Sequence, residues 1–289
     1  GFNAKNVDLT LDGNIRQVEF NNYNYQNIIA KGNFKNKIFK GAVSIDDPNV
    51  KIDGLNGMIN FSTKVPQFNF DANVAKLNLK NIQLTNDNFS LTGKFNLNFS
   101  GDNIDNFLGS AKIYNATLLD NDQKLSFDSL TINSYIIVGK KYLSVQSNEL
   151  DANVAGNFKI LELPEAFQLL LNRYYPSYIN KPGRNIHAQD FTFDIKTKVV
   201  SDYIGLLSKK IKGFDNTNIS GYLNLSTNTL NIKANVPAFN YSNIDFTNVN
   251  FTGTGTFDTL KLAGNISDVI INDSLHLPDT KILLTANND

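Results

Sequence analysis

Residues 93–101 read GKFNLNFSG, and this stretch decides the fold. Between its two glycines, apolar and polar side chains alternate as Phe95, Asn96, Leu97, Asn98, Phe99 and Ser100. An alternation with a period of two residues places the apolar side chains on one face of an extended strand and the polar ones on the other. Similar alternation recurs in residues 191–199, 221–236 and 246–257. Because one such strand cannot bury its apolar face alone, the sequence predicts a sheet of many strands in series.

Composition narrows the classes of function that the chain can have. The 289 residues are 41% hydrophobic and 19% charged, and 27 Lys and Arg balance 27 Asp and Glu, so no net charge directs the chain toward nucleic acid. The chain has no Cys, which excludes a thiolate nucleophile, a Cys metal site and a disulfide framework. No run of 18 apolar residues is present, so the sequence predicts no membrane-spanning helix.

The rhythm of the chain predicts three segments. In residues 1–160 and 214–289, short alternating stretches separated by Gly, Asn and Pro predict strands that belong to one continuous architecture. Residues 161–213 differ, because they contain two stretches with helical spacing. We predict helices over residues 164–175, with Pro164 in the first turn, and over residues 201–211.

Two local signals lie within the first segment. Residues 103–108 interrupt the alternation and predict a single helical turn. Gly54 lies between two alternating stretches, so we expect separate strands over residues 50–52 and 57–62.

No pattern of catalytic or metal-binding residues stands out. His187 and His276 are the only histidines and each stands alone, which favours ordinary surface positions over a metal site. The Asp-Asp pair at residues 46–47 and the Asp-Asn-Asp stretch at residues 120–122 could ligate calcium. Both lack the full pattern of a calcium-binding loop, and Asp and Asn are common turn formers. The Gly253–Gly255 stretch lies inside an alternating strand, so the nucleotide-binding interpretation fails on context. We therefore expect no enzyme activity, no cofactor, no metal and no nucleic-acid partner.

The apolar stripe has two interpretations. It is either the core of a closed sandwich or barrel, or the lining of an open groove for apolar ligands, and periodicity alone does not choose between them. Under the second interpretation the candidate lipid-groove residues are Phe95, Leu97, Phe99, Phe191, Phe193, Leu223, Leu225, Leu230, Ile232 and Phe251.

Two stretches carry a resemblance to a known family. Residues 147–178, SNELDANVAGNFKILELPEAFQLLLNRYYPSY, combine Leu150-Asp151-Ala152, Gly156 and a Leu-rich helix that closes on tyrosines. Residues 22–57 contain a Tyr–strand–Gly–strand–Gly–strand–Asp-Pro-Asn unit, here Tyr25, Gly32, Gly41, Asp47, Pro48 and Asn49. Together these stretches cover about a quarter of the chain. They resemble TamB-like proteins of the AsmA-like superfamily, in the form found in Bacteroidetes.

The resemblance implies a fold and two functions. The fold is an elongated, folded-over antiparallel sheet, called a β-taco, with an apolar groove and one or two short helices. The family implies a periplasmic bridge, anchored in the inner membrane in the full-length protein, that conducts phospholipid to the outer membrane. The alternative is a scaffold of the translocation and assembly module, which assists insertion of outer-membrane β-barrels together with a BamA-like partner. Because the pattern is already running at Gly1, we expect an internal fragment of such a bridge.

Overall fold

The computed structural model describes residues 8–20, 22–83, 88–120, 123–207, 210–272 and 275–287. Over these residues the protein is mainly β, with 68% of the chain in strands, and it has seventeen strands in an open antiparallel sheet and two short α-helices. The predicted fold class is therefore confirmed. The chain divides into two compact units, residues 1–133 and 134–289, and the helix-bearing segment predicted for residues 161–213 lies inside the second.

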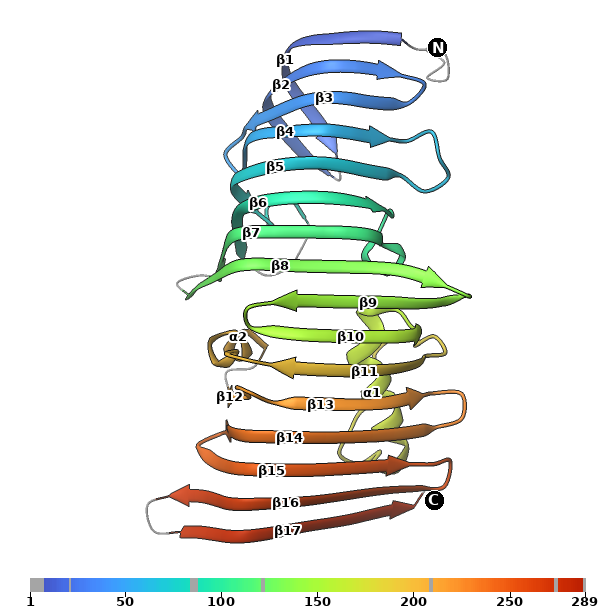
Figure 1. The fold of residues 1–289 in the computed structure, drawn as a ribbon, viewed down its shortest axis with the longest axis vertical. Helices are drawn as coiled ribbons and strands as arrows, with labels where there is room; N and C mark the ends of the chain where they lie inside the picture. Colours follow the sequence, from blue (N-terminus) through green and yellow to red (C-terminus); the bar gives the residue numbers. More distant parts are fainter. Residues whose placement is uncertain are drawn as a thin grey trace. The chain divides into compact units, whose positions relative to one another are not determined.

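In the first unit each strand pairs with the next along the chain (Figure 1). The strands are β1 (Asp8–Phe20), β2 (Tyr23–Lys35), β3 (Ile38–Asp46), β4 (Val50–Asn60), β5 (Gln67–Asn78), β6 (Phe89–Ser100) and β7 (Leu108–Asp120), followed by β8 (Gln123–Ile137), which crosses the division. A 3-10 turn at Ile104–Asn106, capped by the Asn103 side chain, confirms the predicted helical turn.

The second unit continues the antiparallel order. Its strands are β9 (Lys140–Ser147), β10 (Leu150–Asn157), β11 (Asp190–Thr197), β12 (Ile211–Gly213), β13 (Asn218–Asn224), β14 (Thr229–Tyr241), β15 (Ile244–Gly255), β16 (Thr259–Asn272) and β17 (Leu275–Asn287). Along the chain, helix α1 (Leu163–Tyr174) follows β10 and helix α2 (Ser201–Leu207) follows β11.

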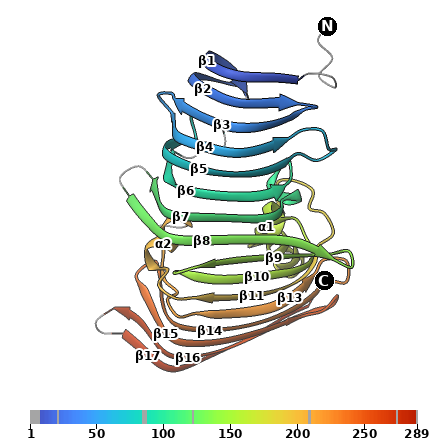
Figure 2. The ribbon, with the colours of Figure 1, turned by 45° about the horizontal axis from the view of Figure 1, so that its top comes forward.

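Most strands of the first unit bend once, along a line that crosses the sheet. Neighbouring strands change register there, for example between Val74 and Leu77 of β5 and between Thr92 and Lys94 of β6. In β2 the same line passes through Asn27, whose φ is 50°. Asn adopts this left-handed conformation more readily than most residues, and a bulge bends its strand. Each such strand therefore has a long arm and a short arm, and Figure 2 shows the sheet curling over.

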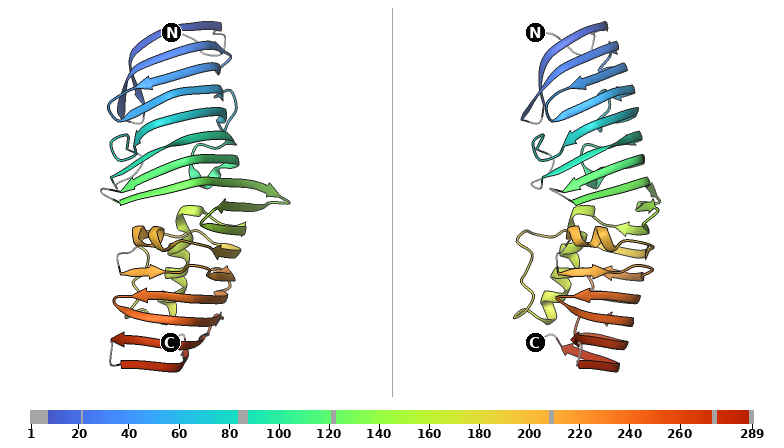
Figure 3. Two further views of the ribbon diagram at one scale, coloured as in Figure 1. Left: turned by 60° about the vertical axis from the view of Figure 1, so that its left-hand side comes forward. Right: turned by 90° about the vertical axis from the view of Figure 1, so that its left-hand side faces the viewer.

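Helix α1 covers one face of the sheet in the second unit (Figure 3). Ala166, Leu170 and Tyr174 recur every four residues, so they share one side of the helix, and their exposed fractions are 0%, 1% and 6%. They pack against Phe158 and against strand residues Phe191, Phe193, Leu223, Leu230 and Leu260. The predicted helix over residues 164–175 is confirmed to within one residue, and its apolar side packs on a sheet face.

Two expectations about element bounds are wrong. Gly54 does not end a strand, because β4 runs from Val50 to Asn60 and absorbs the glycine as a local register shift. Helix α2 ends at Leu207 and does not reach residue 211, since Ile211 pairs with Tyr241 as the start of β12. Residues 208–209, which belong to the predicted helix over residues 201–211, lie outside the described residues.

Candidate functional site: the apolar face of the first unit

The first unit carries a continuous apolar face on the long arms of its strands. Antiparallel pairing aligns the side chains in rows that run across the strands. One row is Phe34, Phe39, Ile59, Phe68 and Phe99, a second ends in Phe70, Leu97 and Ala111, and a third is Ala30, Val43, Leu55, Ala72, Phe95 and Ile113. We call these three rows the open face.

The large side chains of the open face are half-buried. Its fully buried members are the small residues Ala30, Ala72 and Ala111, whereas every Phe, Leu, Val and Ile in the three rows keeps partial access to solvent. The two clusters of buried side chains found among the described residues both belong to the second unit. The open face therefore differs from a close-packed core, in which side chains of this size are shielded from water.

Aromatic side chains are concentrated in the first row and continue into the loops at its end. Phe68 and Phe99 stack with ring centroids 4.8 Å apart, and Phe107 lies 5.0 Å beyond Phe99. Phe61, which is 50% exposed, packs edge-to-face against Phe68, with ring centroids 6.3 Å apart. These contacts fix the rings as an apolar surface at the outer end of the long arms.

Glycines in the second row let the strands approach closely. Gly32, Gly41 and Gly57 are paired across β2, β3 and β4, and a Cβ at Gly57 would lie 2.1 Å from the carbonyl oxygen of Asn69. The φ of Gly57 is +153°, which side chains rarely permit. The row consequently has no side chains over three strands and then continues as Phe70 and Leu97.

The short arms are held by a hydrogen-bonded clamp. Asp47 is 5% exposed and accepts hydrogen bonds from the Tyr23 hydroxyl, from the Gln26 N–H and from the Asn49 N–H. The Asn49 amide in turn donates to the Tyr23 oxygen at 2.9 Å. Burial, followed by the bond to Asp47, raises the pKa of Tyr23, so its hydroxyl stays a donor. The Asp-Pro-Asn motif therefore ties the β3–β4 turn to β2, and the tyrosine bonded to it is Tyr23 rather than Tyr25.

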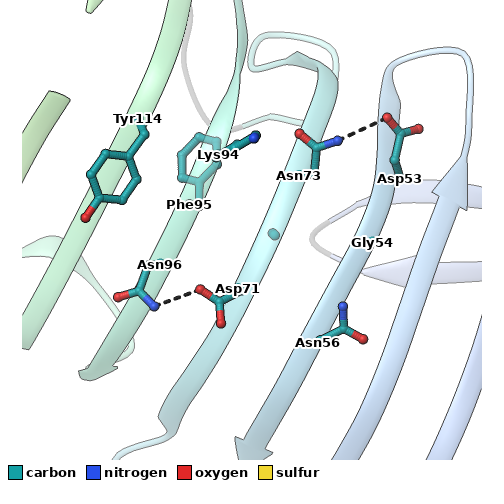
Figure 4. Close-up of a pocket in the computed structure, with 10 residues that line it drawn as sticks. Asp53, Gly54, Asn56, Asp71, Asn73, Lys94, Phe95, Asn96 and Tyr114 are labelled. Atoms are coloured by element: carbon teal, nitrogen blue, oxygen red, sulfur yellow. Dashed lines mark hydrogen bonds between the residues drawn. The ribbon is translucent and has the colours of Figure 1, made fainter. Parts of the chain in front are cut away.

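The opposite face of the first unit is polar and holds a shallow depression of about 440 Å³ (Figure 4). Asn96 donates to Asp71 at 2.7 Å and Asn73 donates to Asp53 at 3.4 Å. Phe95 lies on the far side of the β6 ribbon from these pairs. Amides and carboxylates that satisfy one another in this way make a solvated outer surface, as the sequence alternation predicts.

The structure separates the ten predicted groove residues into two groups. Phe95, Leu97 and Phe99 belong to the open face of the first unit. Phe191, Phe193, Leu223 and Leu230 are between 0% and 8% exposed beneath α1, and Leu225 and Ile232 pack against that same cluster. Phe251 packs against a second cluster formed by Val236, Val249, Ile266 and Val269. A ligand could reach Phe191, Phe193, Leu223 and Leu230 only if α1 moved.

Several members of the open face were not identified from the sequence. Phe34, Phe39, Phe68 and Phe70 have the same alternation as residues 93–101, so their strands were predicted. What the alternation could not give is the register that aligns them with Phe99 and Leu97. The signal was therefore present in each strand, whereas the rows exist only in the folded sheet.

The remaining candidate residues have structural roles. The His187 ring lies 2.7 Å from the Glu162 carboxylate and the His276 ring lies 3.5 Å from the Asp268 carboxylate. No group of three or more His, Cys, Asp or Glu side chains that could hold a metal occurs within the part of the chain that the structure describes. Asp47 belongs to the clamp, residues 121–122 lie outside the described residues, and residues 253–255 lie within β15.

Comparison with protein-family models, with curated proteins and with solved structures finds no match for this chain. Within the described ranges, no helix combines the length and the apolar character needed to cross a membrane. The open face is thus the feature of the fold from which a function can be argued.

Proposed function

We propose that the open face binds the acyl chains of phospholipid, and that the protein is part of a periplasmic bridge that conducts phospholipid between the inner and outer membranes. The observation that supports this proposal is the partial exposure of three aligned rows of large apolar side chains on the first unit. The resemblance to TamB-like proteins supports the periplasmic setting and the inner-membrane anchor of a full-length protein. The proposed role is binding and transfer, without catalysis.

The dimensions of the rows suit an acyl chain. The row from Phe34 to Phe99 crosses β2 to β6, and four strand spacings of about 4.8 Å give about 19 Å. One layer of acyl chains occupies about 15 Å, half of a hydrocarbon core of about 30 Å. A single chain laid along the row would therefore be in contact with apolar side chains over its whole length.

Burial of the acyl chain provides the driving force. Each methylene removed from water contributes about 0.8 kcal/mol, which is partly offset by the loss of freedom of the bound lipid. The open face has no hydrogen-bonding side chains in its three rows, so it recognises little about a lipid beyond the volume of its acyl chain. We expect low selectivity among acyl chains, with the head groups held in water.

The alternative is a scaffold for outer-membrane β-barrel insertion with a BamA-like partner. Such a scaffold would pair strand edges with an incoming barrel segment, so its affinity would come from main-chain hydrogen bonds. The apolar rows are not required for that pairing. The two functions can therefore be separated by a substitution that changes the rows and leaves the backbone in place.

A neighbouring pair of substitutions tests the proposal. Leu97 is half-buried in the open face between Phe70 and Ala111, whereas Asn98 is exposed on the polar face of the same strand. Because water reaches the open face, a carboxylate in Leu97→Asp can remain solvated and the sheet should still fold. We expect native mass spectrometry to find phospholipid on the wild type and on Asn98→Asp, and much less on Leu97→Asp.

Three other outcomes would contradict the proposal. If Leu97→Asp does not fold, as judged by circular dichroism, the rows behave as a closed core in which a carboxylate has no partner. If it folds and keeps its full lipid load, the acyl chains do not lie against β6. Absence of lipid from the wild type, together with binding of an unfolded barrel strand by both variants, would favour the scaffold.

A further inference from the structure

The turn between β8 and β9 exposes four large apolar side chains in succession. Tyr135, Ile136 and Ile137 end β8 and are 49%, 55% and 52% exposed, and Val138 in the turn is 96% exposed. Figure 1 shows this hairpin end projecting past the neighbouring end of β10. Isolated apolar residues on a surface are ordinary, whereas a contiguous exposed group indicates an interaction site.

The backbone of this turn is unfavourable for the residue that it carries. Val138 has φ of 49° and Gly139 has φ of 75°, and two positive φ angles in a two-residue turn define type I′. Asn or Asp is favoured at the first position, and the β-branched side chain of Val is strongly disfavoured there. The other two-residue turns with two positive φ angles, at residues 36–37 and 242–243 among those described, each contain an Asn.

Val138 therefore costs free energy in two ways, through its backbone conformation and through its exposure. Strained residues of this kind are concentrated at functional sites, where the neighbouring structure holds them in place. Here the stacked rings of Tyr135 and Tyr142, 5.3 Å apart, brace the two strands just behind the turn. The turn is thus a rigid support for an apolar tip.

The charges that flank the tip along the chain are positive. Lys140 follows the turn and is exposed, whereas Lys141 is only 9% exposed and its ammonium lies 5.5 Å from the centre of the Phe158 ring. Between Asp128 and Glu149 the sequence contains no acidic residue. An apolar tip with tyrosines behind it and the exposed Lys140 beside it has the order of groups found where proteins enter a lipid–water interface.

We propose that residues 135–140, the hairpin tip, insert into the surface of a phospholipid bilayer that contains anionic lipid. Successive side chains of a strand point to opposite faces, so Ile136 and Ile137 are exposed on the two different faces of the hairpin. A folded protein partner would cover one face and the end of the tip, whereas fluid lipid can surround all of it. This site is separate from the open face, and it would bring the second unit to a membrane surface.

Val138→Asn tests the proposal without endangering the fold. Asn suits the type I′ turn, so the melting temperature should stay the same or rise, while the most exposed apolar side chain is lost. In flotation with vesicles of equal parts phosphatidylcholine and phosphatidylglycerol, we expect the wild type to float. We expect the affinity of Val138→Asn for these vesicles to be lower by about tenfold. Val199→Asn is the matched control, because Val199 is also exposed, at 67%, and lies away from the hairpin.

A fluorescent reporter locates the inserted residues directly. The chain has no Trp, so Ile137→Trp places a single tryptophan, which can be excited selectively over tyrosine, on the hairpin tip. Its emission should shift to shorter wavelength when these vesicles are added, and the emission of Val199→Trp should not. An unshifted Ile137→Trp spectrum, or equal flotation of wild type and Val138→Asn, would overturn the proposal.

Two further results bear on the occupant of the tip and on the open face. If the wild type does not float but forms dimers that Val138→Asn abolishes, the tip binds a second copy and the membrane proposal is wrong. Lipid that co-purifies with the open face should be unchanged in Val138→Asn. Loss of flotation by Val138→Asn and loss of bound lipid by Leu97→Asp therefore report on two different proposals.

Discussion

Replacement of Leu170 by Ala should remove a large part of the stability of the second unit. Leu170 is 1% exposed on α1 and packs within a cluster that includes Phe191, Leu223 and Leu260. Truncation of a fully buried Leu costs about 2–5 kcal/mol, because the transfer free energy of the lost atoms adds to the cost of the cavity. Since sheet and helix enclose the side chain, we expect limited collapse and a loss of about 3 kcal/mol.

The measurement is thermal unfolding followed by circular dichroism, together with urea denaturation. For a unit of this size, a loss of about 3 kcal/mol lowers the melting temperature by roughly 6–12 °C. Leu161→Ala is the matched control, because Leu161 is 58% exposed and should change stability by less than about 0.5 kcal/mol. If the two variants melt together, α1 is not docked on the sheet in solution, and the predicted groove residues beneath it are accessible after all.

Three further predictions concern the devices that hold the fold. Burial opposes ionisation of Glu162, but hydrogen bonds from His187 outweigh it and lower the pKa of the Glu162 carboxyl below its ordinary value. The stabilising effect of the ionised carboxylate is present at neutral pH and is lost as pH falls through that lowered pKa, so Glu162→Gln should flatten the stability–pH curve in acid. Gly57→Ala should destabilise by more than about 2 kcal/mol in urea unfolding, because its Cβ would meet backbone, whereas Gly13→Ala, with nothing within 4 Å, should change little. Asn115, with φ of 47° inside β7, should tolerate Gly but lose about 1–2 kcal/mol as Val, measured by the same unfolding assay; equal stability of Gly and Val variants would show that the bend is not required.

The bend of the sheet shows how far local reasoning reaches. The sequence places Asn27 and Asn115 inside alternating stretches, where Asn is ordinarily a turn former, and we did not predict the bend from them. The structure shows both residues with positive φ on the line where the strands turn over. A single Asn in a strand is a weak signal, and it becomes informative only when neighbouring strands change register beside it.

The location of α1 had a similar limit. The sequence predicts the helix and an apolar side that includes Phe167, Leu170, Leu171 and Tyr174, because helical periodicity is a property of consecutive residues. In the structure Ala166, Leu170 and Tyr174 are the buried residues of that side, and Phe167 and Leu171 are partly buried beside them. The periodicity does not specify the surface that this side meets. Strands with the same alternation of apolar and polar residues consequently differ in burial: Leu97 in the first unit is half-exposed, whereas Leu223 in the second unit is buried.

The sequence by itself determined the strands, the face on which each side chain lies and the position of α1, since these follow from the chirality and repeat of the backbone over a few residues. Only the tertiary structure decided the register of the rows, the line of bending and the coverage of each apolar face. These depend on contacts between residues far apart in the chain, and an identical apolar stripe is compatible with either an open or a covered surface. In this protein α1 covers one apolar stripe of the second unit and makes it a core, whereas the open face of the first unit keeps partial access to solvent.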